Sequence, residues 1–312
     1  GTTHLEDHNS FVILATSVDD GKTWKECAVV DPDGPGVRRA FDPQVWITPD
    51  GRLAWFWADR TGPKENSVAD GLWVSYLKDA TAEFTELSRP RCVAHGVMNN
   101  KPTVLRDGAW VLPVCAWYSA RSSGMVVSTD CGESWTFRGG AMVPFGDRKF
   151  DEHSIVEMLN GDLWTLPRCV SGVRRAISHD KGVTWTEAEP FADGSIRHTS
   201  SRIAFGRLSS GNLLLIKHGP LDQDVGRTDM TAYLSRDDGK TWEGGLLLDE
   251  RIKACYPIFS QASDGLIYCT YDFARNTLQN ILFCTFTEAD VLAKKDVSGR
   301  VRFRQVIHAK AE

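Results

Sequence analysis

The 312-residue sequence has no long apolar run, no excess of basic residues and no C-x-x-C cysteine pair. No segment approaches the roughly 20 apolar residues of a membrane-spanning helix, which argues against a membrane protein. The formal net charge of −5 argues against nucleic acid or an anionic membrane as a partner. The eight cysteines lack the spacing of metal ligands. We therefore expect reduced thiols, which favours a cytoplasmic location.

Four copies of one eight-residue pattern, S-x-D-x-G-x-[ST]-W, are present instead. They begin at Ser17, Ser128, Ser178 and Ser235. In a tight turn the aspartate can accept backbone N–H groups, glycine supplies a positive φ, and tryptophan packs on the sheet behind. Turn glycines also recur every 50 to 57 residues, each before a short apolar run: Gly51, Gly108, Gly161, Gly211 and Gly265. This period is typical of propeller blades.

The octapeptides resemble the Asp-boxes, or bacterial neuraminidase repeats, of sialidases and related β-propeller proteins. The repeats predict an all-β fold, a six-bladed β-propeller of four-stranded antiparallel blades with the Asp-boxes at turns. We expect one propeller domain over residues 1–312. Counting back from the first box places residue 1 inside blade one. We therefore expect only the outer strands of that blade, about 9–16 and 26–30, with its inner strands upstream.

Strand direction divides such a propeller into two faces. The Asp-boxes and the turn glycines share one face. The opposite face collects the start of each inner strand and the loop between the second and third strands of each blade. In sialidase-like propellers this second face carries the active site. The sequence places charged and hydrogen-bonding residues there, although such side chains are costly on inner strands unless paired or hydrated.

Basic side chains outnumber carboxylates at these positions. Because the planar arginine fork suits a carboxylate, the excess favours an acidic sugar or glycan as the ligand. The expected substrate-binding residues are Arg39, Asn100, Lys101, Arg168, His198, Arg202 and Arg275.

The expected catalytic residues follow from the same face. Tyr256 of the last blade and Glu152 of the fourth match the tyrosine nucleophile of sialidases and the glutamate that takes its proton. The resemblance implies a phenol because a carboxylate would be repelled by the carboxylate of a sialic acid. Asp42, at the start of an inner strand, is expected to protonate the leaving oxygen. Strand alternation places Asp151 and His153 on one face and Glu152 on the other, so Asp151 is the alternative base.

The predicted function is a glycoside hydrolase resembling exo-sialidases, which removes a terminal acidic sugar. Two alternatives stay open. One is a polysaccharide lyase or rhamnosidase-like hydrolase of uronic-acid glycans that uses His153 or Tyr256. The other is a non-catalytic carbohydrate-binding propeller. Asp151, His153 and His198 form no compact zinc motif, so neither a metal nor a cofactor is predicted.

Overall fold

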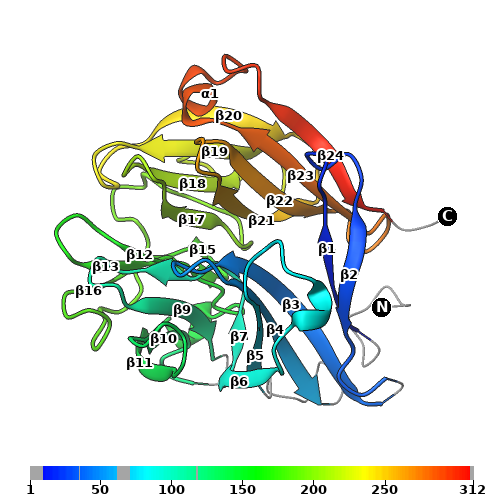
Figure 1. Cartoon of the computed structure of the whole chain (residues 1–312). Helices are drawn as coiled ribbons and strands as arrows, with labels where there is room; N and C mark the ends of the chain where they lie inside the picture. Colours follow the sequence, from blue (N-terminus) through cyan, green and yellow to red (C-terminus); the bar gives the residue numbers. More distant parts are fainter. Residues whose placement is uncertain (1–9, 35, 62–70, 117–118, 310–312) are drawn as a thin grey trace.

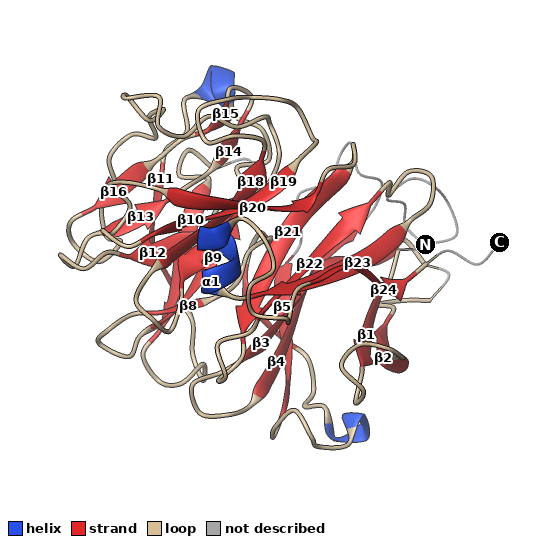
Figure 2. Ribbon diagram, turned by 90° about the horizontal axis from the view of Figure 1, so that it is seen from above, coloured by secondary structure: helices blue, strands red, loops and turns tan. Residues whose placement is uncertain are grey.

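The computed structural model describes residues 10–34, 36–61, 71–116 and 119–309. Its sheets are antiparallel and are arranged around one axis as the blades of a β-propeller (Figures 1 and 2). The all-β propeller prediction is confirmed. Within the described ranges, no helix has the length and hydropathy needed to cross a membrane.

Five blades are described, each named below by its strands. The first is β3 (Arg38–Ile47), β4 (Leu53–Thr61), β5 (Gly71–Leu77) and β6 (Arg91–Ala94). The second is β7 (Val97–Met98), β8 (Thr103–Val104), β9 (Trp110–Cys115), β10 (Ser123–Ser128) and β11 (Thr136–Ala141). The third is β12 (Ile155–Glu157), β13 (Leu163–Thr165) and β16 (Ala176–Ser178), with an inserted hairpin of β14 (Arg168–Cys169) and β15 (Gly172–Val173).

The last two blades are regular four-stranded sheets. They comprise β17 (Ala204–Arg207), β18 (Leu213–His218), β19 (Met230–Ser235) and β20 (Glu243–Asp249), then β21 (Ala254–Gln261), β22 (Ile267–Phe273), β23 (Asn280–Phe286) and β24 (Arg302–His308). The described helices are short: η1 (Phe84–Glu86), η2 (Phe145–Asp147) and α1 (Glu288–Ala293). A capping box starts α1: the Thr287 side chain accepts from the Asp290 N–H, and the Asp290 side chain accepts from the Thr287 N–H.

The first described strands, β1 (Val12–Thr16) and β2 (Lys25–Val30), form a separate two-stranded sheet. The structure therefore shows five blades, and the prediction of six is corrected on this point. The first Asp-box joins β1 to β2 just as the second joins β10 to β11. Trp24 of that box packs edge-on against Phe283 of β23, with ring centroids 6.0 Å apart, so this sheet contacts the last blade.

All four Asp-boxes adopt the same hydrogen-bonded turn. In the fourth, Ser235 Oγ donates to Asp237 (2.9 Å) and accepts from the Gly239 N–H (2.7 Å). The Thr241 N–H and Oγ donate to the two Asp237 oxygens at 2.8 and 2.5 Å. The same contacts recur around Asp19, Asp130 and Asp180. Gly239 has a φ of +86°, which an L side chain rarely adopts.

These turns predict a specific acid sensitivity. Hydrogen bonds from Thr241 lower the pKa of Asp237 from 3.8 to about 2. Because the folded-state pKa lies below the ordinary value, the carboxylate stabilises the fold above about pH 4, and this stabilisation is lost as the pH falls toward 2. We expect Asp237→Asn to lower the Tm at pH 7 and to make the Tm decline less steeply between pH 4 and 2. Thermal melts across that range test this, and an unchanged slope would contradict it.

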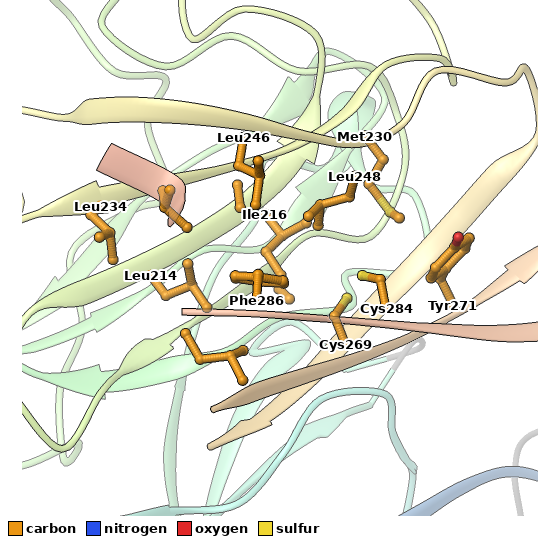
Figure 3. Packing of buried hydrophobic residues seen from close by; sticks show 14 of the residues in the cluster. Leu214, Ile216, Met230, Leu234, Leu246, Leu248, Cys269, Tyr271, Cys284 and Phe286 are labelled. Atoms are coloured by element: carbon orange, nitrogen blue, oxygen red, sulfur yellow. The ribbon is translucent and has the colours of Figure 1, made fainter. Parts of the chain in front are cut away.

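The hydrophobic core lies between the faces of neighbouring blades. Figure 3 shows Leu214, Ile216 and Leu234 of the β17–β20 blade near Phe286 of β23, and all four side chains are fully buried. Such strands read as continuous apolar runs because both of their faces are covered. All eight cysteines lie within the described ranges and carry free thiols.

Candidate active site

Antiparallel pairing brings the expected site positions together at one end of the blades. The start of β21 lies beside the end of β22, where Cys255 pairs with Asp272. Tyr256 follows at a break in this register and has a φ of +57°. Asp42 stands at the equivalent break in β3, with a φ of +49°. Each residue precedes a proline, and such bulges re-aim a side chain out of the regular strand alternation.

Four guanidinium groups surround Tyr256. Arg168 Nη1 and Arg227 Nη1 each donate to the phenolic oxygen at 3.4 Å. The guanidinium carbons of Arg275, Arg202, Arg227 and Arg168 lie 4.2, 5.0, 5.4 and 5.9 Å from the ring centroid. Contacts of this kind with an aromatic ring are favourable for each cation. They come from three different blades and define the Tyr256 cluster.

Two carboxylates complete the Tyr256 cluster. Glu152 accepts from Arg168 Nη1 at 2.8 Å, and Asp272 pairs with Arg275 at 3.0 Å. Burial lowers the pKa of Arg168, but Glu152 and Tyr256 outweigh burial, so the net shift is upward. Burial raises the pKa of Asp272 despite its arginine neighbours. Four cations therefore face two carboxylates, and this net positive charge suits an anionic ligand.

Asp42 reaches the Tyr256 cluster through a neighbouring inner strand. Asn99 Nδ2 donates to Asp42 at 2.8 Å, and the Asn99 carbonyl accepts from Arg202 Nη1 at 2.6 Å. Arg202 Nη2 in turn donates to the Tyr256 carbonyl at 3.2 Å. One chain of hydrogen bonds thus joins the β3 bulge to the β21 bulge.

The backbone around Asp151 and Glu152 departs from a regular strand. Phe150 and Asp151 both have positive φ, and the regular strand β12 begins only at Ile155. Strand alternation therefore does not apply to this segment. Glu152 accepts from the Arg168 nitrogen that also donates to the Tyr256 hydroxyl, while Asp151 is 1% exposed and paired with Arg148 at 2.8 Å. These contacts favour Glu152 as the base, and the role of either carboxylate stays a prediction.

His153 lies behind the site. Its side chain is fully buried, Nε2 lies 2.9 Å from the Gly124 carbonyl, and Nδ1 lies 3.1 Å from the Asp151 carbonyl. Burial lowers its pKa. Each ring nitrogen lies against a backbone carbonyl, and Nδ1 also lies 3.5 Å from Cys115 Sγ, so the enclosed ring is poorly placed to take a proton from a substrate. The structure therefore gives little support to a catalytic role for His153, which stays a prediction.

His198 is also buried, in a stacked pair with His218. Its Nε2 lies 3.0 Å from His218 Nδ1, and His218 Nε2 lies 2.8 Å from the Ala254 carbonyl. Because a carbonyl only accepts, His218 carries its hydrogen on Nε2 and accepts from His198. Burial lowers the pKa of His218 to about 4 and that of His198 as well, so both are neutral at pH 7. This pair contacts β21 through the Ala254 carbonyl, and a role of His198 in substrate binding stays a prediction.

Three further expected binding residues have their described contacts elsewhere or are described only by their burial. Asn100 is buried and donates to the His153 carbonyl at 2.9 Å. Arg39 is 1% exposed and stacks on Phe41, with its guanidinium carbon 4.6 Å from the ring centroid. Lys101 is half-buried, and burial lowers its pKa to about 8.

The other three expected arginines, Arg168, Arg202 and Arg275, all belong to the Tyr256 cluster. Sequence reasoning missed Arg227, although it lies in the loop between β18 and β19 on the expected face.

Among the residues placed in the structure, no group of three or more His, Cys, Asp or Glu side chains could hold a metal ion.

The model of the BNR repeat-like domain matches residues 6–269. The chain belongs to the BNR repeat-like domain family. The resemblance seen in the Asp-boxes is therefore confirmed, and the family match covers all five turn glycines.

Several known glycoside hydrolases resemble this chain in sequence or in fold. A sialidase of Bacteroides fragilis (strain YCH46) is 25% identical over 85% of this chain and 54% of that protein, so the chain spans about half the length of that relative. The intramolecular trans-sialidase from Ruminococcus gnavus matches with a TM-score of 0.69 at 16% identity, over 92% of this chain and 90% of that one. A GH93 α-L-arabinofuranosidase of Fusarium graminearum gives 0.59 at 12%, over 91% and 87%. At such identities the structural likeness shows the fold alone.

Proposed function

We propose that this BNR repeat-like protein is an exo-acting glycoside hydrolase of sialidase type that removes a terminal sugar bearing a carboxylate. The observation that carries the proposal is the Tyr256 hydroxyl, held by Arg168 and Arg227 with Glu152 on the same Arg168 nitrogen. The curated sialidase relative supports the same reading. A terminal acidic sugar would place its carboxylate against the arginine forks.

The proposed reaction has two steps. In the first, the Tyr256 oxygen bonds to the anomeric carbon and its proton passes to Glu152. The bond to the leaving oxygen breaks, and that oxygen takes the carboxyl proton of Asp42. In the second, water attacks the anomeric carbon and gives a proton to Asp42, while the bond to Tyr256 breaks and Glu152 returns the phenolic proton. Tyrosine suits this role because a neutral phenol can approach a carbon that already carries a carboxylate.

The four arginines have different roles in the proposed reaction. Arg168 contacts both the base and the nucleophile, so it stabilises the phenolate that forms as the proton leaves. Arg227 reaches the same oxygen from another blade. Arg202 and Arg275 lie over the ring and supply positive charge for the substrate carboxylate. A histidine-based lyase has less support, because both nitrogens of His153 contact backbone.

We also propose that residues 1–312 belong to one propeller domain. The support is local: the two-stranded sheet of β1 and β2 contacts the last blade through Trp24, and β1 contacts β3.

An aryl-glycoside screen tests the proposed activity. We expect the aryl group to be released from an aryl sialoside, and not from an aryl glycoside of a neutral sugar, because only the first carries a carboxylate for the arginines. A lyase would produce an unsaturated uronate that absorbs ultraviolet light. A binding module would retain the acidic glycan and release nothing. Either of these two results would overturn the proposal.

A further inference from the structure

Lys217, near the end of β18, is a fully buried cation outside the Tyr256 cluster. Its Nζ lies 2.5 Å from the carbonyl oxygens of His218 and Pro220, 3.1 Å from that of Gly219 and 3.4 Å from that of Gln223. A buried ammonium group is costly unless its three N–H donors are used. Here four convergent carbonyls surround it, an arrangement that resembles the oxygen shell of a bound cation.

The charge on Lys217 persists at neutral pH. Burial lowers its pKa to about 8, while the nearby Asp224 and Asp222 oppose that shift. The stacked His198 and His218 on this side are neutral, and the charges of Lys217 and Arg227 both act on them. The Lys217 ammonium therefore donates to backbone carbonyls, and the carboxylates of Asp222 and Asp224 favour its charged form.

Three of the four carbonyls, those of Gly219, Pro220 and Gln223, belong to the loop that connects β18 to β19, residues 219–229. Few backbone hydrogen bonds hold this loop internally: Gly219 N–H to the Asp229 carbonyl at 2.9 Å and Gln223 N–H to the Pro220 carbonyl at 3.3 Å. Tyr233 also donates to the Gly219 carbonyl at 3.0 Å. Lys217 thus supplies several of the contacts that give the loop one conformation, and it does so from a rigid strand.

The far end of the same loop carries Arg227. Its Nη1 donates to the Tyr256 hydroxyl at 3.4 Å and its Nη2 to the Ser200 carbonyl at 2.9 Å. Its own carbonyl accepts from the Lys253 N–H at 2.9 Å, which ties the loop to the turn before β21. The placement of this guanidinium therefore depends on how the loop is folded.

We propose that Lys217 is a positioning residue: its ammonium group acts as a tethered internal cation that folds loop 219–229 so that Arg227 meets Tyr256. The catalytic part of this inference rests on the proposed hydrolase function, whereas the folding of the loop does not. A misplacement of about 1 Å at a reacting group can reduce a rate by about a hundredfold, so such a residue matters without touching the substrate.

Hydrogen exchange measured by mass spectrometry tests the loop directly. Lys217→Met keeps an unbranched side chain that is one heavy atom shorter and removes its charge and its donors. We expect faster amide exchange in residues 219–229 and unchanged exchange in β17, β19 and β20. Lys240→Met, at an exposed lysine of the same blade, is the matched control and should leave the loop unaltered. If Lys217→Met folds poorly, Lys217→Gln keeps two donors and should show an intermediate exchange rate. Unchanged loop exchange in a folded variant overturns the inference.

A double-mutant cycle tests the link to Arg227. With an acidic aryl-glycoside, we expect Lys217→Met to lower kcat/KM by about tenfold to a hundredfold. In an Arg227→Met background the same change should have almost no further effect, because the residue that it positions is gone. Additive losses would identify Lys217 as a general stabiliser and overturn the positioning role. If the wild type releases nothing, the proposed function fails, while the exchange experiment still decides the folding of the loop.

Discussion

Replacing Tyr256 with phenylalanine is expected to reduce kcat on an acidic aryl-glycoside by about a thousandfold. The variant loses only the oxygen that Arg168 and Arg227 contact, and the four guanidinium groups keep their positions around the ring. The affinity for an acidic sugar should therefore stay nearly the same. Steady-state kinetics and calorimetric titration with a free acidic sugar measure the two effects separately.

Tyr268→Phe is the matched control for this experiment. Tyr268 lies on β22 of the same blade, near the turn glycine Gly265 at the end remote from Tyr256, and the variant should keep wild-type rates. If Tyr256→Phe also keeps near-normal rates and changes the unfolding free energy by only about 1 kcal/mol, the phenol is structural. In that case the proposed nucleophile is wrong.

Gly172→Ala is expected to have the largest effect on stability. Gly172 in β15 has a φ of +116°, and a Cβ there would lie 1.9 Å from the His198 carbonyl oxygen. No side-chain rotation can relieve this overlap, because the backbone fixes the position of the Cβ and the His198 oxygen is itself a backbone atom. The expected loss in the free energy of unfolding is about 3 kcal/mol or more, from the overlap and from the strained φ together.

Gly211→Ala separates the two causes. Gly211 has a φ of +91°, and nothing lies within 4 Å of its added Cβ, so this variant carries only the cost of the backbone conformation, about 1–2 kcal/mol. Urea unfolding of both variants and the wild type gives the comparison. Equal losses would show that the β14–β15 hairpin moves away from His198 at little cost.

The Asp-box turns were predictable from sequence because their interactions are local. Each turn is made by contacts between residues two to four positions apart, as between Ser235, Asp237 and Thr241. The same eight residues also include the glycine that adopts a positive φ and the tryptophan that packs against the sheet. The repeated spacing of such units then indicates a propeller. It did not predict the number of blades that the structure shows, because β1 and β2 pair only with each other in the described sheets.

The candidate site depends on contacts that no local pattern encodes. Arg168 and Tyr256 are 88 positions apart and meet only because their blades surround one axis. The bulge at Tyr256 and the positive φ at Asp151 aim side chains in directions that strand alternation does not describe. Burial also depends on the tertiary structure: the side chains of His153 and His198 are both enclosed and contact neighbouring groups. The sequence by itself therefore determined the blade motif and the charge of the site face. Only the tertiary structure decided which of those charged residues meet, since that depends on how distant strands pack around the axis.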